Sequence, residues 1–158
     1  MSTSYGQALS PEQQACLNDA VGDKHHALLL LIEVRGALDL ARLQRAADQV
    51  LVDQPILATR LLRVPTYRGV RQTLEPRSGW PLRIEPAAQG WGAFEAQMRA
   101  EQQLGFAEDA PTLAVLHACR FGEQHHGLAL RISALLSDRN GLRVLCAALH
   151  QAYVADQS

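Results

Sequence analysis

Apolar residues recur at three- and four-residue spacing in one segment of this chain, which predicts an amphipathic helix that ends before Pro55. The apolar positions of this stripe are Leu40, Leu43, Ala46, Ala47, Val50 and Leu51. Asp39 stands immediately before the stripe, where its carboxylate would accept a hydrogen bond from a backbone N–H of the first turn. We therefore expect a helix that starts after Asp39 and buries one face.

Three other segments are expected to be helical. The segment SPEQ at 10–13 is typical of a helix start, because Ser10 can cap the helix and Gln13 completes a capping box. Pro11 suits the first helical position, and we expect this helix to run to about Ala20. The spacing of apolar residues predicts the other two helices over 90–104 and 140–154.

Short apolar runs bounded by glycine, proline or charged residues predict the strands. These runs are 27–34, 58–64, 69–74, 82–85, 112–121 and 127–136. The first run has the continuous apolar character of a mostly buried strand. The second and third runs flank a segment of turn composition at 65–68, so we expect them to form a hairpin.

The order of these elements predicts an α/β fold. Helix, strand, helix, hairpin, strand, helix, strand, strand and helix follow one another without an internal repeat or a low-complexity linker. We expect a two-layer sandwich with a mainly antiparallel or mixed sheet and the helices on one face. A chain of 158 residues can bury roughly two-thirds of its unfolded surface, so a single domain over 1–158 is expected.

Composition excludes several classes of function. The net charge is -1 and the basic residues are scattered, so we expect neither a nucleic acid nor an anionic membrane as partner. The longest apolar run, 27–32, is far below the ~20 residues that cross a bilayer. The N-terminus also lacks a signal-peptide pattern, so a cytoplasmic protein is expected.

Cys16, Cys119 and Cys146 form no CxxC pair, which favours buried reduced thiols over a disulfide or a zinc site.

Two histidine pairs, His25-His26 and His125-His126, precede expected strands. Neighbouring strand residues point to opposite faces, so neither pair can hold a metal alone, and we expect solvent-exposed histidines. A composite metal site formed by both pairs is the alternative. His117 and His150 are expected to be packed or surface residues rather than bases.

No nucleophile motif is present. None of the candidate nucleophiles has an adjacent histidine in sequence; they are Ser133, Ser137, Cys119 and Cys146. The chain also lacks a G-x-S-x-G elbow, a phosphate-cradling loop and a dinucleotide fingerprint. Hydrolase, kinase and NAD-enzyme functions therefore have no support.

Five motifs follow one another in the order found in one enzyme superfamily. LSPEQ at 9–13 is similar to L-S-x-x-Q, and GALDLARLQRA at 36–46 is similar to G-x-L-D-x-x-x-L-x-x-A. DQPILATRL at 53–61 stands in the place of R-H-x-x-L-R-T-x-F, and VRQTL at 70–74 in that of a strand with a recurrent glutamine. The segment 133–139 stands in the place of H-H-x-x-x-D-G. The chain thus resembles the N-terminal lobe of nonribosomal peptide synthetase condensation and heterocyclisation domains, which implies half of a chloramphenicol acetyltransferase-like fold.

The departures from these motifs fall on residues that carry chemistry in the family. Ala134 occupies the place of the second motif histidine, which the resemblance implies is needed for condensation, and a methyl group cannot transfer a proton. Ser133 replaces the first histidine, Arg139 the glycine, and Ala58 the arginine of L-R-T. Heterocyclisation domains carry D-x-x-x-x-D here, of which only Asp138 is kept. Neither catalytic pattern is intact.

Asp138 is expected to be structural, because the arginine that pairs with it in the family is absent. A lone buried carboxylate is costly, so Asp138 should cap the last helix or pair with Arg60 or Arg139. Arg139 replaces a residue that lines the phosphopantetheine tunnel in the family, where it would narrow the tunnel or bind an anionic partner. A solvated Arg139 is the alternative. Arg60 and Ser137 are further candidates for partner or tunnel contact.

The resemblance implies a role in nonribosomal peptide or hybrid polyketide biosynthesis. We expect a non-catalytic condensation-like domain that binds a carrier protein, a synthetase or a tailoring enzyme. Phosphopantetheine would be brought by a carrier partner, and no bound cofactor or metal is expected. The alternative is one lobe of a split acyltransferase or heterocyclase, completed by a C-terminal partner lobe, with Ser133, Ser137 and Asp138 near the reaction centre. That enzyme would form amides or heterocycles on carrier-bound substrates.

Two further expectations concern ligands and assembly. A small-molecule binding or immunity module that keeps only the fold is a third hypothesis. An isolated lobe leaves one face or edge of its sheet uncovered, and exposed apolar surface of this kind usually binds a partner. We therefore expect a homo- or hetero-oligomer.

Overall fold

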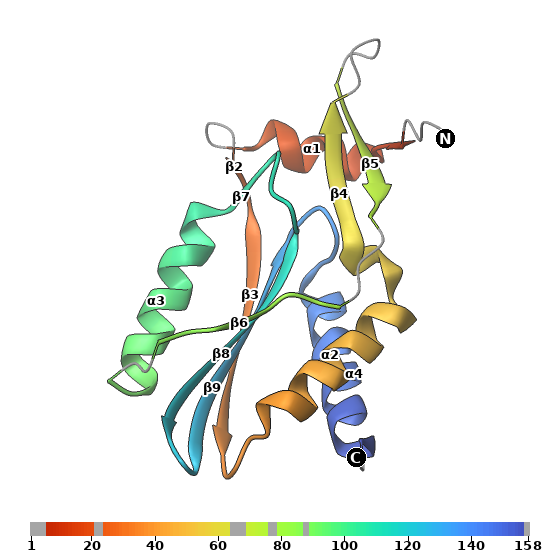
Figure 1. Cartoon of the computed structure of the whole chain (residues 1–158). Helices are drawn as coiled ribbons and strands as arrows, with labels where there is room; N and C mark the ends of the chain where they lie inside the picture. The colour runs from red at the N-terminus through yellow and green to blue at the C-terminus, as the bar shows by residue number, and fades with distance from the viewer. Residues whose placement is uncertain (1–5, 21–23, 64–68, 76–78, 87–88, 157–158) are drawn as a thin grey trace.

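A four-stranded sheet forms the centre of the molecule in this computed structural model, which describes residues 6–20, 24–63, 69–75, 79–86 and 89–156. Its strands lie in the order β3 (Ala27–Arg35), β9 (His125–Ser133), β8 (Ala114–Gly122) and β6 (Leu82–Ile84) (Figure 1). β3, β9 and β8 are antiparallel, and β6 pairs with β8 in parallel. The α/β class and the mixed sheet predicted from the sequence are therefore confirmed.

Two helices, α2 (Leu40–Asp53) and α4 (Arg139–Ala155), cover one face of this sheet (Figure 1). Asp39 caps α2 as predicted, because its side chain accepts a hydrogen bond from the backbone N–H of Arg42 at 3.1 Å. The buried residues of α2 all belong to the predicted stripe; they are Leu43, Ala46, Ala47, Val50 and Leu51. The apolar periodicity of the sequence therefore identified the buried side of this helix.

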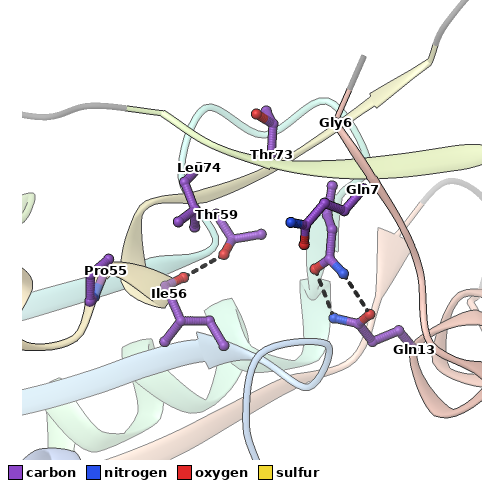
Figure 2. A pocket seen from close by; sticks show the side chains of 9 residues that line it. Gly6, Gln7, Gln13, Pro55, Ile56, Thr59, Thr73 and Leu74 are labelled. Carbon is purple, nitrogen blue, oxygen red and sulfur yellow. Dashed lines mark hydrogen bonds between the residues drawn. The ribbon is translucent and has the colours of Figure 1, made fainter. Parts of the chain in front are cut away.

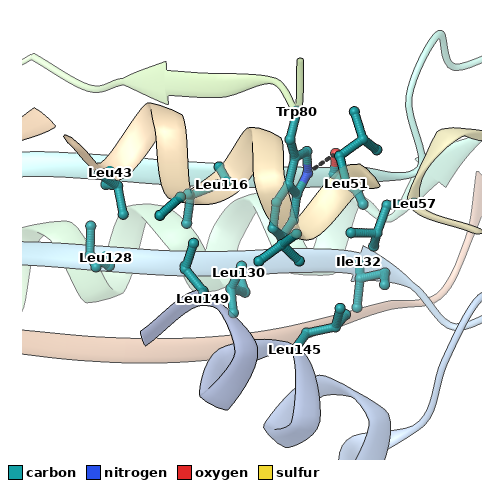
Figure 3. Packing of buried hydrophobic residues seen from close by; sticks show 14 of the residues in the cluster. Leu43, Leu51, Leu57, Trp80, Leu116, Leu128, Leu130, Ile132, Leu145 and Leu149 are labelled. Atoms are coloured by element: carbon teal, nitrogen blue, oxygen red, sulfur yellow. Dashed lines mark hydrogen bonds between the residues drawn. The ribbon is translucent and has the colours of Figure 1, made fainter. Parts of the chain in front are cut away.

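The core between these helices and the sheet is apolar throughout (Figure 3). Leu128, Leu130 and Ile132 of β9 meet the buried residues of α2 and α4 here. Trp80 closes the same core, and its indole N–H donates to the carbonyl of Ala114 at 3.2 Å. Because full burial of one such apolar side chain contributes about 1.5–3 kcal/mol, this core is the main source of stability.

The third long helix, α3 (Trp91–Leu104), lies on the opposite face of the sheet (Figure 1). Phe94 and Met98 of α3 are fully buried against Ala129 of β9. The expectation of two layers with all helices on one face is therefore corrected, since helices cover both faces. The cause lies in β9, where nearly every residue is buried and successive side chains point to opposite faces, so each face needs a cover.

A smaller sheet stands beside the central one. The predicted hairpin is formed by β4 (Thr59–Arg63) and β5 (Val70–Leu74), and β1 (Gln7–Ala8) pairs with the outer side of β5. The turn predicted at 65–68 lies outside the described residues. A one-turn 3₁₀ helix, η1 (Pro55–Ala58), precedes β4 where the sequence predicts no helix, because a single turn leaves no periodicity to detect.

The first helix, α1 (Pro11–Asn18), starts with the predicted capping box. The Gln13 backbone N–H donates to Ser10 Oγ at 3.1 Å, and the Ser10 N–H donates to Gln13 Oε1 at 2.9 Å. Two-residue strands β2 (Lys24–His25) and β7 (Phe106–Ala107) pair with each other. Both are too short for a sequence pattern to predict.

Two strands differ from the prediction in ways that bear on function. β3 is half-buried rather than mostly buried, because it is an edge strand with β9 on one side only. β9 ends at Ser133 rather than at 136, so the residues that follow Ser133 leave the sheet as a turn. Within the described residues, no helix has the length and apolarity that a membrane span requires.

Candidate functional site

The segment that the sequence resemblance places at H-H-x-x-x-D-G is a tight turn between β9 and α4, which we call the motif turn (residues 133–139). Three backbone hydrogen bonds fix its start: Ser133 N–H to the Leu113 carbonyl at 2.8 Å, Ala134 N–H to the His26 carbonyl at 3.0 Å, and Leu136 N–H to the Ser133 carbonyl at 3.0 Å. The turn is therefore held to the residues that immediately precede β8 and β3.

Ser133 forms a buried pair with His25, a histidine that lies 108 residues away in sequence. The Oγ atom of Ser133 is 2.6 Å from Nε2 of His25, and it accepts a hydrogen bond from the Leu135 N–H at 3.1 Å. Ser133 is 0% exposed and His25 is 2% exposed. The expectation of a solvent-exposed His25 is therefore wrong, because the strand β2 turns this side chain inward.

A serine next to a histidine suggests an activated nucleophile, but the surroundings of this pair do not support that chemistry. Burial lowers the pKa of His25, although the carboxylate of Glu108 opposes the shift, so the imidazole is neutral at pH 7. Among the described residues, Nδ1 of His25 has no hydrogen-bond partner to orient it as a base. Because Ser133 is also closed to solvent, the pair anchors the motif turn.

Ala134 brings only a methyl group to the turn and is half-buried. A methyl group neither accepts nor donates a proton, so this position cannot serve as an acid or base. Ala58, at the place of the motif arginine, is buried in the main core, with Leu57 beside it. Ala58 therefore contributes apolar packing to the core and no charge near Asp138.

Asp138 is the N-cap of α4. Its Oδ1 accepts a hydrogen bond from the Gly141 N–H at 2.8 Å, and its carbonyl accepts from the Leu142 N–H at 3.0 Å. The capping role predicted from the sequence is confirmed. Arg60, the alternative partner, instead forms an exposed ion pair with Glu75 at 3.2 Å.

Ser137 and Arg139 flank the cap. The Ser137 hydroxyl donates to the Asp138 carbonyl at 3.2 Å, and Arg139 is exposed as the first residue of α4. A side chain at Gly141 would clash with Ser137, since its Cβ would lie 2.0 Å from the Ser137 Oγ. The glycine thus permits the close approach of the turn to the first turn of α4.

A groove of about 770 Å³ lies beside the motif turn, between α1, η1 and β5 (Figure 2). The groove is defined by its lining residues, which are Gly6, Gln7, Gln13, Pro55, Ile56, Thr59, Gln72, Thr73 and Leu74. The amides of Gln13 and Gln72 exchange two hydrogen bonds of 3.0 Å, and Gln13 Nε2 also donates to the Leu135 carbonyl at 3.2 Å. The groove is therefore coupled to the motif turn, a role of Gln13 that its capping motif did not indicate.

Comparison with known proteins yields likeness only at the level of three-dimensional structure. No family model matches the chain, and no curated protein matches it. The starter condensation domain of rhizomide synthetase RzmA superposes with a TM-score of 0.81 at 18% identity, covering 96% of this chain and 38% of that one. The X-domain from teicoplanin biosynthesis gives 0.78 at 21% identity, covering 97% and 33%. The tallysomycin biosynthesis protein TlmII gives 0.76 at 20% identity, covering 94% and 38%.

This chain has the chloramphenicol acetyltransferase-like fold of condensation domains. It covers only 33–38% of the length of these solved structures, so the likeness concerns part of each of them. The recognition made from the five motifs is thereby confirmed for the fold. The likeness concerns the fold alone, whereas the motif turn, the pair of His25 with Ser133 and the groove are observed in the structure of this chain.

A buried polar network on the α3 face is a second cluster of ionisable groups among the described residues. His117 is fully buried, and its Nδ1 lies 2.7 Å from Oε1 of Glu85, while Arg131 Nε donates to its Nε2 at 3.4 Å. Gln97 and Glu101 of α3 join the network through Glu85 Oε2 at 3.0 Å and Arg131 Nη2 at 3.7 Å. His117 is thus a packed histidine, as expected, and the network fastens α3 to the sheet.

Burial lowers the pKa of His117; its hydrogen bond to Glu85 opposes the shift and the neighbouring Arg131 cation adds to it. The imidazole is therefore neutral at pH 7, with a proton on Nδ1 for Glu85 and a lone pair on Nε2 for Arg131. The sequence did not predict this network, because its members come from separate elements that share no pattern.

The two histidine pairs lie at opposite ends of β3. Ala27 pairs with Ser133 and Arg35 pairs with His125, so about 26 Å of extended strand separates them, which excludes the composite site. No group of three metal-ligating side chains occurs in the described parts of the chain. His126 is buried, contrary to expectation, whereas His125 is half-buried at 2.7 Å from Glu33.

The exposed histidines His26 and His150 agree with the expectation of surface positions. Cys16, Cys119 and Cys146 are free thiols, and only Cys119 is fully buried. Burial raises the pKa of Cys16 and of Cys146, and Asp19 adds to the shift at Cys16. Both side chains are therefore thiols rather than reactive thiolates.

Proposed function

We propose that this chain is a non-catalytic condensation-like domain that binds a protein partner in nonribosomal peptide or hybrid polyketide biosynthesis. The partner is a carrier protein, a synthetase or a tailoring enzyme, and the chain acts in the cytoplasm. The observation that carries the proposal is Ala134 in the motif turn, whose methyl group lies where the resemblance places a proton-handling imidazole.

The other polar groups of the motif turn are already used for structure. Ser133 is enclosed with His25, and Asp138 is bound to the first turn of α4. Ser133 is closed to solvent, and one carboxylate oxygen of Asp138 is held by the cap. Loss of the catalytic group together with retention of the fold supports a binding role.

A protein of the same fold gives independent support for partner binding. The X-domain from teicoplanin biosynthesis forms a complex with OxyB, and it superposes on this chain with a TM-score of 0.78 at 18% identity. In the present chain, Arg139 is the exposed basic residue of the motif turn, with Asp138 and Ser137 beside it. We propose that Arg139 contacts an acidic partner surface or the phosphate of a carrier-bound phosphopantetheine.

A second candidate is one lobe of a split acyltransferase or heterocyclase. The observation that favours it is that the chain covers 33–38% of the solved condensation-fold structures, a share that fits a single lobe. In this case Ser133, Ser137 and Asp138 would lie near a reaction centre that a complementary lobe completes.

The test is a calorimetric titration of the chain with carrier protein in its apo and phosphopantetheine-loaded forms, run beside a condensation assay with both carriers charged. We expect saturable binding without turnover. Arg139→Ala should weaken binding by about fivefold, corresponding to ~1 kcal/mol for an exposed charge pair. Arg35→Ala is the matched control, because Arg35 is also exposed, lies at the far end of β3 and should leave binding unchanged.

Turnover without partner affinity would overturn the proposal. Turnover that appears only when a complementary lobe is added, and that falls in Ser133→Ala or Asp138→Ala, would establish the second candidate instead. Turnover that is unchanged in both variants would reject that candidate.

A further inference from the structure

The helix α3 has fewer buried residues than either of the other two long helices. Only Phe94 and Met98 of α3 are buried, whereas α2 buries five residues and α4 buries three. Gly90 and Gly105, which bound α3, have φ angles of 113° and 69°, and Gly90 supplies no side-chain cap. Glycine adopts positive φ without steric cost, so the backbone at both ends of α3 is able to act as a hinge.

Polar contacts with the buried network supply the rest of the attachment of α3 to the sheet. Glu101 Oε2 lies 3.7 Å from Nη2 of Arg131 and 3.9 Å from Nε2 of His117. Gln97 donates to Oε2 of Glu85 at 3.0 Å. The attachment of α3 therefore depends on the charge state of a network that lies mostly beneath it.

His117 is the member of this network whose charge changes near neutral pH. The printed charges around it, two carboxylates and two guanidinium groups, cancel while the imidazole is neutral; they belong to Glu85 after β6, Glu101 of α3, Arg131 of β9, and Arg83 of β6, which meets Glu101 at 3.6 Å. The imidazole accepts the Arg131 N–H at Nε2, at 3.4 Å. A proton on Nε2 would place two donors face to face and add an unbalanced positive charge at a residue that is 0% exposed.

We propose that this network is a proton-operated latch, in which protonation of His117 releases α3 from the sheet while α2 and α4 stay packed. Release gives water access to the imidazolium, because α3 covers this face of the sheet. The apolar core on the opposite face contains none of the charged groups of the network, so it holds the rest of the fold together. The latch goes beyond the proposed partner binding and does not rest on it.

The direction of the pH effect follows from the burial of His117. Burial lowers the pKa of the imidazole, its hydrogen bond to Glu85 opposes the shift, and Arg131 adds to it. When α3 is released, the pKa returns towards its ordinary value of 6.5, so the released state binds more protons below that pH. The attachment of α3 should be constant above pH 6.5 and should weaken by up to about tenfold per pH unit below it.

Hydrogen exchange followed by mass spectrometry between pH 8 and pH 5 tests the latch, with rates corrected for the pH dependence of intrinsic exchange. We expect the amides of α3 to lose protection below pH 6.5 at pH values where those of α2 and α4 are still protected. His117→Gln should make the protection of α3 independent of pH, whatever its level. His150→Gln is the matched control, because His150 is exposed on α4, and it should keep the pH dependence of the natural chain.

The two tryptophans of the chain provide a second readout that leaves His117 in place. Trp91, the first residue of α3, packs against Phe121 with ring centroids 6.5 Å apart, whereas Trp80 is 2% exposed in the opposite core. With Trp80→Phe, the remaining Trp91 should become more accessible to acrylamide quenching as the pH falls from 7.5 to 5.5. With Trp91→Phe, the remaining Trp80 should stay shielded over the same range.

Three results would overturn the latch: loss of protection in all three helices together, an unchanged pH dependence of α3 in His117→Gln, or equal quenching of the two tryptophans at every pH. Since these experiments use the chain alone, their failure would leave the proposed partner binding intact. Conversely, the latch would stand even if no carrier protein, synthetase or tailoring enzyme bound the chain.

Discussion

The two faces of the central sheet are held by different forces. On the face covered by α2 and α4, apolar side chains such as Leu130 and Leu145 fill a continuous core. On the face covered by α3, a smaller apolar cluster around Phe94 is joined by the buried network of His117 and Glu85. The stability of the first face depends on the apolar area removed from water. The stability of the second face depends also on the geometry of each hydrogen bond and on the protonation state of His117.

Because of this difference, the stability of the two faces should respond differently to substitutions and to pH. Hydrophobic burial is non-directional and does not vary with pH, whereas a buried polar group loses its stabilising effect when one partner is removed. We therefore expect substitutions on the α2 and α4 face to cause the larger loss in the free energy of unfolding, and this loss should not depend on pH. Substitutions in the polar network on the α3 face should cause a smaller loss, and its size should depend on which hydrogen bonds the new side chain can form.

The largest effect is expected at the centre of the apolar face. Leu130→Ala removes a side chain that is 1% exposed, so it leaves a cavity between β9 and the helices. The free energy of unfolding should fall by about 2–5 kcal/mol, measured by urea denaturation at pH 7.5 and again at pH 6. A loss well below that range, or one that changed with pH, would contradict the assignment of this face as the main core.

The next effect tests the directional network on the opposite face. Glu85→Ala leaves the Nδ1 proton of His117 without its acceptor in a buried site, so the free energy of unfolding should fall by about 1–3 kcal/mol. Glu85→Gln is the matched variant, because it keeps an acceptor oxygen of the same reach and should cost less. Equal losses in the two variants would show that the hydrogen bond is unimportant.

The third prediction concerns pH and follows from the lowered pKa values of His117 and His25. In the unfolded chain an imidazole titrates near 6.5, so below that pH the unfolded state binds more protons than the folded state. Stability should be complete above pH 6.5 and should fall by up to about 1.4 kcal/mol per pH unit for each histidine as the pH drops towards its folded pKa.

Denaturation curves between pH 8 and pH 5 measure this slope. The double variant His25→Gln, His117→Gln should show a shallower slope than the natural chain, while His26→Gln, at an exposed position, serves as the control. A slope that the double variant leaves unchanged would rule out these two histidines as the cause.

The smallest effect is expected at the motif turn, which connects the sheet to the apolar face through α4. Asp138→Ala removes the N-cap, so the free energy of unfolding should fall by about 0.5–2 kcal/mol. Asp138→Asn should keep most of the stability, because asparagine caps nearly as well. A loss in Asp138→Asn that equals that in Asp138→Ala would indicate a role for the charge beyond capping.

The sequence predicts local features well where one segment contains all the information. The stripe of α2, the cap at Asp39 and the capping box of α1 each depend on residues within a few positions of one another. Asp138 was predicted as a cap for the same reason. The five motifs added the overall order, which the likeness to condensation domains confirms at the level of the fold.

Contacts between distant segments were not predictable in this way. His25 meets Ser133 across 108 residues, and Gln13 meets Gln72 across 59. The position of α3 on the second face also depends on β9 being apolar on both sides. The periodicity of such a strand does not show whether helices cover one of its faces or both. These contacts arise from sheet pairing, which brings together residues that share no sequence pattern.

The most direct test of the central claim is single-turnover transfer of an acyl group between two charged carrier proteins at saturating concentrations of the chain. Since Ala134 cannot transfer a proton and Ser133 is enclosed with His25, we predict a rate equal to that of the carriers alone. A rate above that background, lost on Ser133→Ala or Asp138→Asn, would contradict the account and assign chemistry to the motif turn.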